Sequence, residues 1–168
     1  MKRAVLGVGL VAVALAAGAV ALLAMPGRQP EAAAAFGRGT SSPILLIRKF
    51  YTAVDNWNFG NAYLLVDPHA RPAFRPWASG YFTTVAVSFG ALRDPGYRVR
   101  RKTGLYTCVA VRLRARHLDG QTSIDGGWYM TRFTRARHWR ILLPGSRLIP
   151  DGRPRLLRRS ACGRHIRL

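Results

Sequence analysis

The chain has 168 residues, 49% of them hydrophobic, and a formal charge of +20 from 27 Lys+Arg against 7 Asp+Glu. Because roughly 100–200 residues usually form one domain, this length excludes two large independent cores. The charge favours acidic substrates, phosphates, anionic lipid or nucleic acid as partners, and no motif in the sequence requires an enzyme.

Residues 1–27 are predicted to form a transmembrane anchor or a signal segment. Lys2 and Arg3 precede an uncharged run, residues 4–25, which as a helix would span a hydrocarbon core of about 30 Å. The run exceeds the about 7–15 apolar residues of a cleaved signal, which favours a retained anchor. An alanine run before Phe36 offers a cleavage site, so secretion after cleavage is the alternative.

In both cases the positive-inside rule keeps the N-terminus inside and places the rest of the chain outside the cytoplasm. We therefore expect a single-pass protein of the cell membrane with a periplasmic or extracellular domain. Residues 28–43 contain Pro30, Gly37 and Gly39 without a hydrophobic period, which indicates a flexible spacer. The folded domain is predicted over residues 44–149.

A first helix is predicted to begin at Pro43, because Ser42 is a favourable N-cap and proline is tolerated at the first helical position. Its apolar face recurs at spacings of three and four residues. The members of that face are Ile44, Ile47, Phe50, Tyr51, Val54 and Trp57.

Two shorter helices are expected next. One covers residues 59–66, with Ala62, Tyr63, Leu65 and Val66 facing the core, and ends at Asp67-Pro68. The other carries Phe74, Trp77 and Tyr81.

Strands are predicted after Gly80, where the period changes. In residues 106–118, apolar and basic residues alternate. The alternation places Val109, Val111 and Leu113 on the packed face of the strand. It places three arginines on the solvent-exposed face: Arg112, Arg114 and Arg116. The other expected strands are residues 82–92, 97–101, 128–135 and 139–143, with Asp125-Gly126-Gly127 read as a turn. Helices followed by an antiparallel meander predict the α+β class.

Several of these segments resemble the nuclear-transport-factor-2-like superfamily, the SnoaL-like, cystatin-like cone. Residues 47–54 and 58–65 are similar to its paired opening helices, and Gly126-Gly127-Trp128-Tyr129 and Trp139-Arg140-Ile141 to its closing strands. The resemblance implies N-terminal helices packed on a curved sheet, with a pocket at the open end of the cone. That superfamily includes small-molecule enzymes and membrane-tethered extracytoplasmic domains without catalytic activity.

Candidate site residues follow from this layout. Asp67 and His69, in the loop where catalytic members often carry an acid or base, are weak catalytic candidates together with Tyr63; the alternative is a helix stop beside a solvated histidine. The expected pocket residues are Tyr51, Trp57, Trp77 and Tyr81, which could equally be plain core. Asp125 is either a turn residue or a base on a pocket strand.

The two cysteines, Cys108 and Cys162, are expected to pair, because the predicted compartment permits disulfides. The alternative is one buried and one free thiol. No histidine or cysteine spacing fits a metal site, and no cofactor is expected.

Residues 150–168 form a basic C-terminal arm. Its Arg155, Arg158 and Arg159, with the three strand arginines, are candidates to bind an anionic partner such as lipid head groups. Nucleic acid is disfavoured by the predicted location, and a solvated tail without a partner is the other alternative.

The sequence thus favours a non-catalytic, membrane-anchored extracytoplasmic domain that binds envelope or secretion-system proteins or a small ligand. The alternative is a secreted isomerase, dehydratase or cyclase of the same superfamily. A homodimer through the sheet is also open, although three arginines on one strand face would repel across a two-fold axis.

Overall fold

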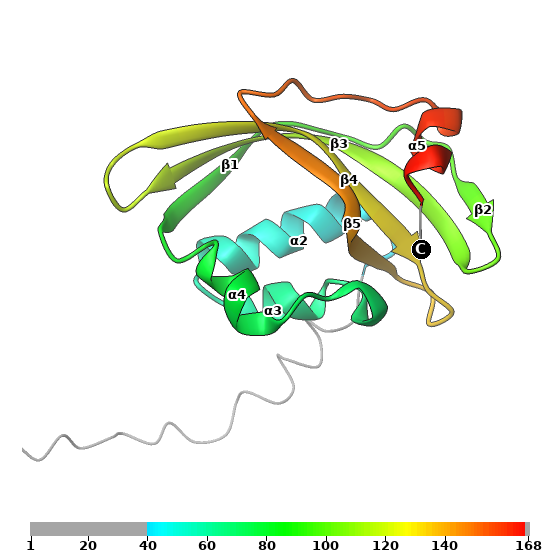
Figure 1. Cartoon of the computed structure of the whole chain (residues 1–168), viewed down its shortest axis with the longest axis horizontal. Coiled ribbons are helices and arrows are strands. Elements are labelled where there is room, and N and C mark those ends of the chain that lie inside the picture. Colours follow the sequence, from blue (N-terminus) through cyan, green and yellow to red (C-terminus); the bar gives the residue numbers. More distant parts are fainter. Residues whose placement is uncertain (1–39, 167–168) are drawn as a thin grey trace, which may run out of the picture.

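The computed structural model describes residues 40–166, so the predicted anchor (1–27) and most of the predicted spacer (28–43) lie outside the described residues. The α+β class is confirmed: three helices lie on one face of a curved antiparallel sheet, and the C-terminal segment crosses the other face (Figure 1). Between residues 40 and 166, no helix is long and apolar enough to cross a membrane.

Helix α2 (Pro43–Asp55) begins where the cap predicted, with the Ser42 hydroxyl accepting the N–H of Leu45 at 3.5 Å. Its buried side includes most of the predicted face and also Leu46 and Ala53. The helix ends before Trp57, whose backbone is left-handed (φ 56°) and whose side chain is 48% exposed. The predicted apolar face therefore extends two residues beyond the end of the helix.

The shorter helices follow the prediction closely. Helix α3 (Phe59–Leu64) is capped by the Asn58 side chain, and α4 (Phe74–Ser79) follows a single 3₁₀ turn, η1 (Pro68–Ala70). Between α3 and η1 the chain runs along the free edge of the last strand, where Val66 bridges Ile141. That bridge places Asp67 at the sheet edge.

The sheet has five strands in the order β1-β3-β4-β5, with β2 pairing beside β3. Their bounds are β1 (Thr84–Arg93), β2 (Val99–Arg101), β3 (Gly104–His117), β4 (Thr122–Phe133) and β5 (Trp139–Pro150). A hairpin turn at residues 134–138 joins β4 to β5, and in it the Thr134 N–H donates to the His138 carbonyl. Strands β3, β4 and β5 are longer than expected at one or both ends.

The predicted turn at Asp125-Gly126-Gly127 is wrong, because these residues lie inside β4. The glycines are needed there for close backbone packing. A Cβ on Gly126 would lie 2.0 Å from the Gly152 carbonyl oxygen, and one on Gly127 would lie 1.9 Å from that of Arg147. Glycine in a strand interior often marks such an approach.

The sheet separates two hydrophobic clusters. The inner cluster lies between the sheet and α2, around Phe50, Val54 and Val111. The outer cluster lies under α5 (Arg159–His165) and includes Trp128 and Met130. The predicted disulfide is confirmed, with Cys108 of β3 bonded to Cys162 of α5 at 2.11 Å.

Candidate functional site

A pocket of about 260 Å³ opens on the inner face of the sheet, between α2, the end of α4 and the strands. Side chains reach it from every strand except β2, because alternate residues of β1, β3 and β4 point toward the helices. Its polar lining comprises Tyr51, Tyr81, Thr84, His117, Ser123, Asp125 and Tyr129, and its apolar lining includes Val87, Leu113 and Leu148.

Two tyrosines meet within the wall of this pocket. The hydroxyls of Tyr51 and Tyr129 are 2.6 Å apart, and both side chains are almost fully buried. Burial raises the pKa of each phenol well above its usual value, and the nearby Asp125 charge adds to the effect. Burial also raises the pKa of Tyr81 to about 12. The three phenols are therefore neutral at physiological pH and act as hydrogen-bond donors or acceptors.

Asp125 supplies the carboxylate among the lining residues. It is half-buried on β4, opposite Leu113 of β3 and Pro150 of β5. The same wall carries His117, whose Nε2 lies 2.9 Å from the Ser123 hydroxyl. The pocket thus combines neutral phenols with one negative group.

The predicted pocket residues are only partly brought together. Tyr51 and Tyr81 line the pocket. Trp77 lies behind it, with its ring 5.2 Å from that of Tyr81 between centroids. Trp57 lies on the surface against Phe59, 6.0 Å between ring centroids, and does not reach the pocket.

The predicted catalytic candidates lie elsewhere. Asp67 is fully buried at the edge of β5, 2.5 Å from a guanidinium nitrogen of Arg132, and its Oδ1 accepts the N–H of His69. The His69 side chain is exposed. Tyr63 donates to the Pro72 carbonyl at 2.7 Å. None of the three lines the tyrosine pocket, so they do not form an acid–base site with it.

The sequence reasoning missed several polar pocket residues: Thr84, His117, Ser123 and Tyr129. The alternation of strand 128–135 marks Tyr129 as a residue of one face, but only the pairing of β4 with β3 shows that this face is the inner one. For Asp125, the strand alternative raised from sequence fits the observed position better than the turn.

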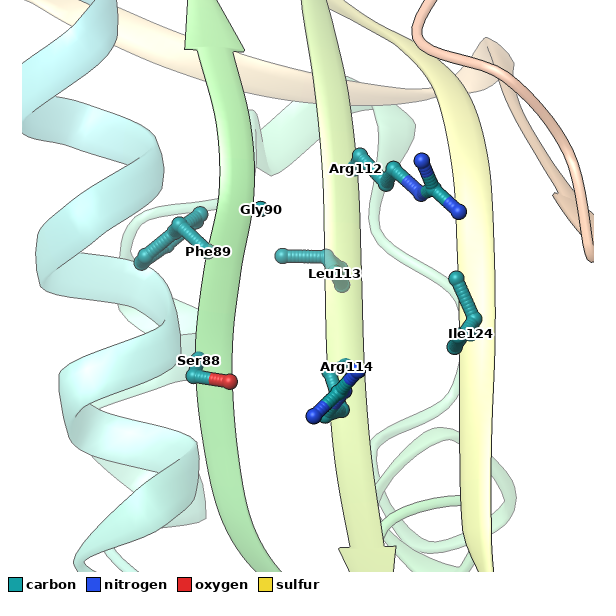
Figure 2. A pocket seen from close by; sticks show the side chains of 7 residues that line it. All are labelled: Ser88, Phe89, Gly90, Arg112, Leu113, Arg114 and Ile124. Carbon is teal, nitrogen blue, oxygen red and sulfur yellow. The ribbon is translucent and has the colours of Figure 1, made fainter.

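The outer face carries the predicted strand arginines. Figure 2 shows Arg112 and Arg114 on β3, between Ser88 and Gly90 of β1 and Ile124 of β4. These residues line a pocket of about 390 Å³. Across the strands, Arg112 faces Ala91 and Gly126, Arg114 faces Ser88 and Ile124, and Arg116 faces Ala86 and Thr122. No carboxylate stands directly opposite any of these three arginines.

The C-terminal arm adjoins this arginine row. Gly152 packs on Gly126, the cross-strand neighbour of Arg112, and the Arg155 N–H donates to the Gly127 carbonyl. Arg155, Arg158 and Arg159 are exposed. The arm is therefore docked along the outer face and held at its far end by the disulfide.

Comparison of the chain with protein-family models, curated proteins and solved structures gives no match.

Proposed function

We propose that this chain is a non-catalytic, membrane-anchored extracytoplasmic domain of the nuclear-transport-factor-2-like type that binds a small cationic ligand in its inner pocket. The observation that carries the proposal is the Asp125 carboxylate, placed among the phenols of Tyr51, Tyr81 and Tyr129.

The charge of Asp125 supports a cationic ligand. Within residues 40–166, Asp94 forms an ion pair with Arg98 and Asp67 forms one with Arg132. Asp125 has no ion-pair partner among these residues. A half-buried carboxylate without a cation is costly unless something positive or hydrogen-bonding reaches it. An ammonium group would supply this partner, and aromatic rings add to its binding.

The phenols support binding rather than catalysis. A general acid or base works best when its pKa lies near the operating pH. The pKa of Tyr81 is raised to about 12, and those of Tyr51 and Tyr129 lie well above their usual value, all through burial. The pocket volume of about 260 Å³ is slightly below the about 300–1,000 Å³ of typical ligand pockets, so it suits only a small molecule.

The test is calorimetric titration of the full chain in detergent with small amines, choline and putrescine, against their uncharged alcohol analogues. We expect an amine to bind and Asp125→Asn to abolish that binding. Asp119→Asn is the matched control, since it removes the same charge from an exposed turn. Equal amine binding by Asp125→Asn and the parent chain would overturn the proposal.

A second candidate is an isomerase, dehydratase or cyclase that uses the same pocket. It is favoured by a carboxylate and phenol hydroxyls lining one cavity. Asp125 would take a proton from the carbon beside a carbonyl, and a phenol would donate a hydrogen bond to the developing oxyanion. Exchange of such carbon-bound protons with deuterated water, lost in Asp125→Asn, would distinguish this activity from binding alone.

A further inference from the structure

A second cavity lies on the outer face of the sheet, at the end where two turns meet. Strand β3 begins after the turn at residues 102–103, and β4 ends at the hairpin of residues 134–138; Leu105 and Phe133 pair beside both turns (Figure 1). The cavity has a volume of about 650 Å³. Its charged and imidazole lining is Lys102, Arg132, Arg135, Arg140, His69 and His138, and no lining residue carries a carboxylate.

Two of these cations are directly opposed in the sheet. Arg132 of β4 is the cross-strand partner of Arg140 of β5, and like charges in that position are destabilising. Asp67 offsets one of them, 2.5 Å from Arg132. The Asp67 N–H donates to the Ile141 carbonyl, which fixes this carboxylate behind the cavity. Nε of Arg132 has no hydrogen-bond partner among residues 40–166, so Asp67 neutralises the charge of Arg132 and leaves this donor unfilled.

Arg140 is held in place by its neighbours. It donates to the Leu64 carbonyl and, at 3.2 Å, to Nε2 of His138. His138 is therefore an acceptor at Nε2 and carries its proton on Nδ1. The fixed guanidinium needs little reordering before an anion binds.

Burial and neighbouring guanidinium groups both disfavour protonation of the cavity's basic groups. Burial and then Arg140 lower the pKa of His138. Burial and then Arg71 lower the pKa of Arg140, although Asp67 acts in the opposite direction. Arg71 is itself fixed by hydrogen bonds to the Val66 and Leu64 carbonyls.

We propose that this cavity binds the phosphate group of a phosphorylated ligand. Guanidinium groups fit phosphate oxygens through two parallel hydrogen bonds, whereas lysine adds a mobile point charge. The half-buried Arg132 and Arg140 line the cavity from adjacent strands, and the exposed Lys102 and Arg135 line it from the two turns. A phosphate in the cavity would thus have cations available from both strands and both turns.

Both a soluble phosphate ester and a lipid head group have this chemistry. Thr40, the first described residue, bridges Trp139, which lies between His138 and Arg140. The chain therefore enters the domain beside the cavity, and the sequence predicts a membrane anchor ahead of that point. The experiment has one arm for each source.

In the first arm, pyrophosphate is titrated into the full chain in detergent and followed by calorimetry. Lys102→Gln with Arg135→Gln should weaken binding about tenfold or more, since one charge-assisted contact is typically worth about that factor. Arg75→Gln with Arg93→Gln is the matched control, because it removes two exposed arginine charges that lie neither in this cavity nor in the arginine row of β3. Arg132 is left unchanged, because removing it would leave the buried Asp67 carboxylate without its cationic partner.

In the second arm, the same proteins are sedimented with vesicles of phosphatidylcholine with and without phosphatidic acid. If the parent chain binds pyrophosphate and the Lys102→Gln, Arg135→Gln variant does not, the site is assigned to soluble phosphates. Binding only to phosphatidic acid, lost in the same variant, assigns it to lipid. Failure to bind either probe, or equal weakening by the control variant, would overturn the proposal.

Discussion

The hydroxyl of Tyr51 on α2 lies 2.6 Å from that of Tyr129 on β4, so a helix residue and a strand residue satisfy each other inside the protein. Changing Tyr51 to Phe leaves the Tyr129 hydroxyl buried without this partner. An unsatisfied buried polar group costs about 1–3 kcal/mol. We expect Tyr51→Phe to lower the free energy of unfolding by about that amount in urea titrations.

Removing both hydroxyls supplies the control for this pair. The double variant, Tyr51→Phe with Tyr129→Phe, leaves no unpaired hydroxyl, and replacing both partners can be nearly neutral. It should therefore be more stable than the sum of the two single variants predicts. Additive effects in the four-protein cycle would contradict the hydrogen bond.

High pH should destabilise the domain through the same residues. Burial raises the pKa of Tyr51 and Tyr129 well above 10.0, and that of Tyr81 to about 12. Between pH 10 and 12 the unfolded chain releases these protons and the folded chain keeps them. Stability is therefore fully present below pH 10 and falls as pH rises, by at most about 1.4 kcal/mol per pH unit for each tyrosine.

The measurement is unfolding at several pH values together with tyrosine absorbance at alkaline pH. Tyr81→Phe should make the loss of stability with pH less steep, because one retained proton is removed from the folded state. Ionisation of all six tyrosines at pH 10 with the fold intact would contradict the raised pKa values.

Local sequence signals predicted the helices better than the strand interior. The cap at Ser42 and the spacing of Ile47, Phe50 and Val54 place α2 correctly, because capping and helical period depend on neighbouring residues alone. Trp57 continues that spacing, yet the helix has already ended at Asp55. The spacing of apolar residues alone does not show at which residue the helix ends.

The pocket depends on pairing that a single sequence does not specify. Tyr51 could be expected there from its helix face, but Tyr129 and His117 come together only through the register of β3 with β4. The glycines after Asp125 predict a turn, whereas this residue lies inside β4. Glycines are required there because the backbone of Arg147 and Gly152, about twenty residues later in the sequence, packs directly against them.

Alanine substitution tests that close approach. In Gly126→Ala the new Cβ would lie 2.0 Å from the Gly152 carbonyl oxygen, and backbone must move to admit it. Overpacking typically costs about 1–3 kcal/mol, and a backbone collision should reach or exceed the upper value. We expect a large loss of stability in thermal unfolding.

Gly60 gives the contrasting control. It lies in α3, and a Cβ there would meet nothing within 4 Å. Because alanine is favoured over glycine in helices by about 0.5–1 kcal/mol, Gly60→Ala should leave stability unchanged or raise it. Similar melting temperatures for the two variants would show that the β4 glycines are not constrained as described.

The disulfide between Cys108 and Cys162 should stabilise the domain by attaching α5 to the outer face of the sheet. Removing a native disulfide of this kind typically costs about 2–5 kcal/mol. Reduction should therefore lower the unfolding temperature and uncover the outer cluster, which includes Trp128. Unfolding of Cys108→Ala with Cys162→Ala should no longer respond to reductant; a persisting response would place the effect elsewhere.

The arginine row on β3 should bind anionic partners without supporting the fold. Arg112, Arg114 and Arg116 are exposed, and neutral residues stand opposite all three. Changing all three to Ser should leave cooperative thermal unfolding intact but weaken sedimentation with phosphatidylglycerol vesicles, because each charge near a surface contributes about 1 kcal/mol. The triple change to Lys keeps the charge and should retain most of that binding. Loss of cooperative unfolding in the Ser variant would show instead that these side chains are packed, and unchanged vesicle binding would exclude this face as the lipid contact.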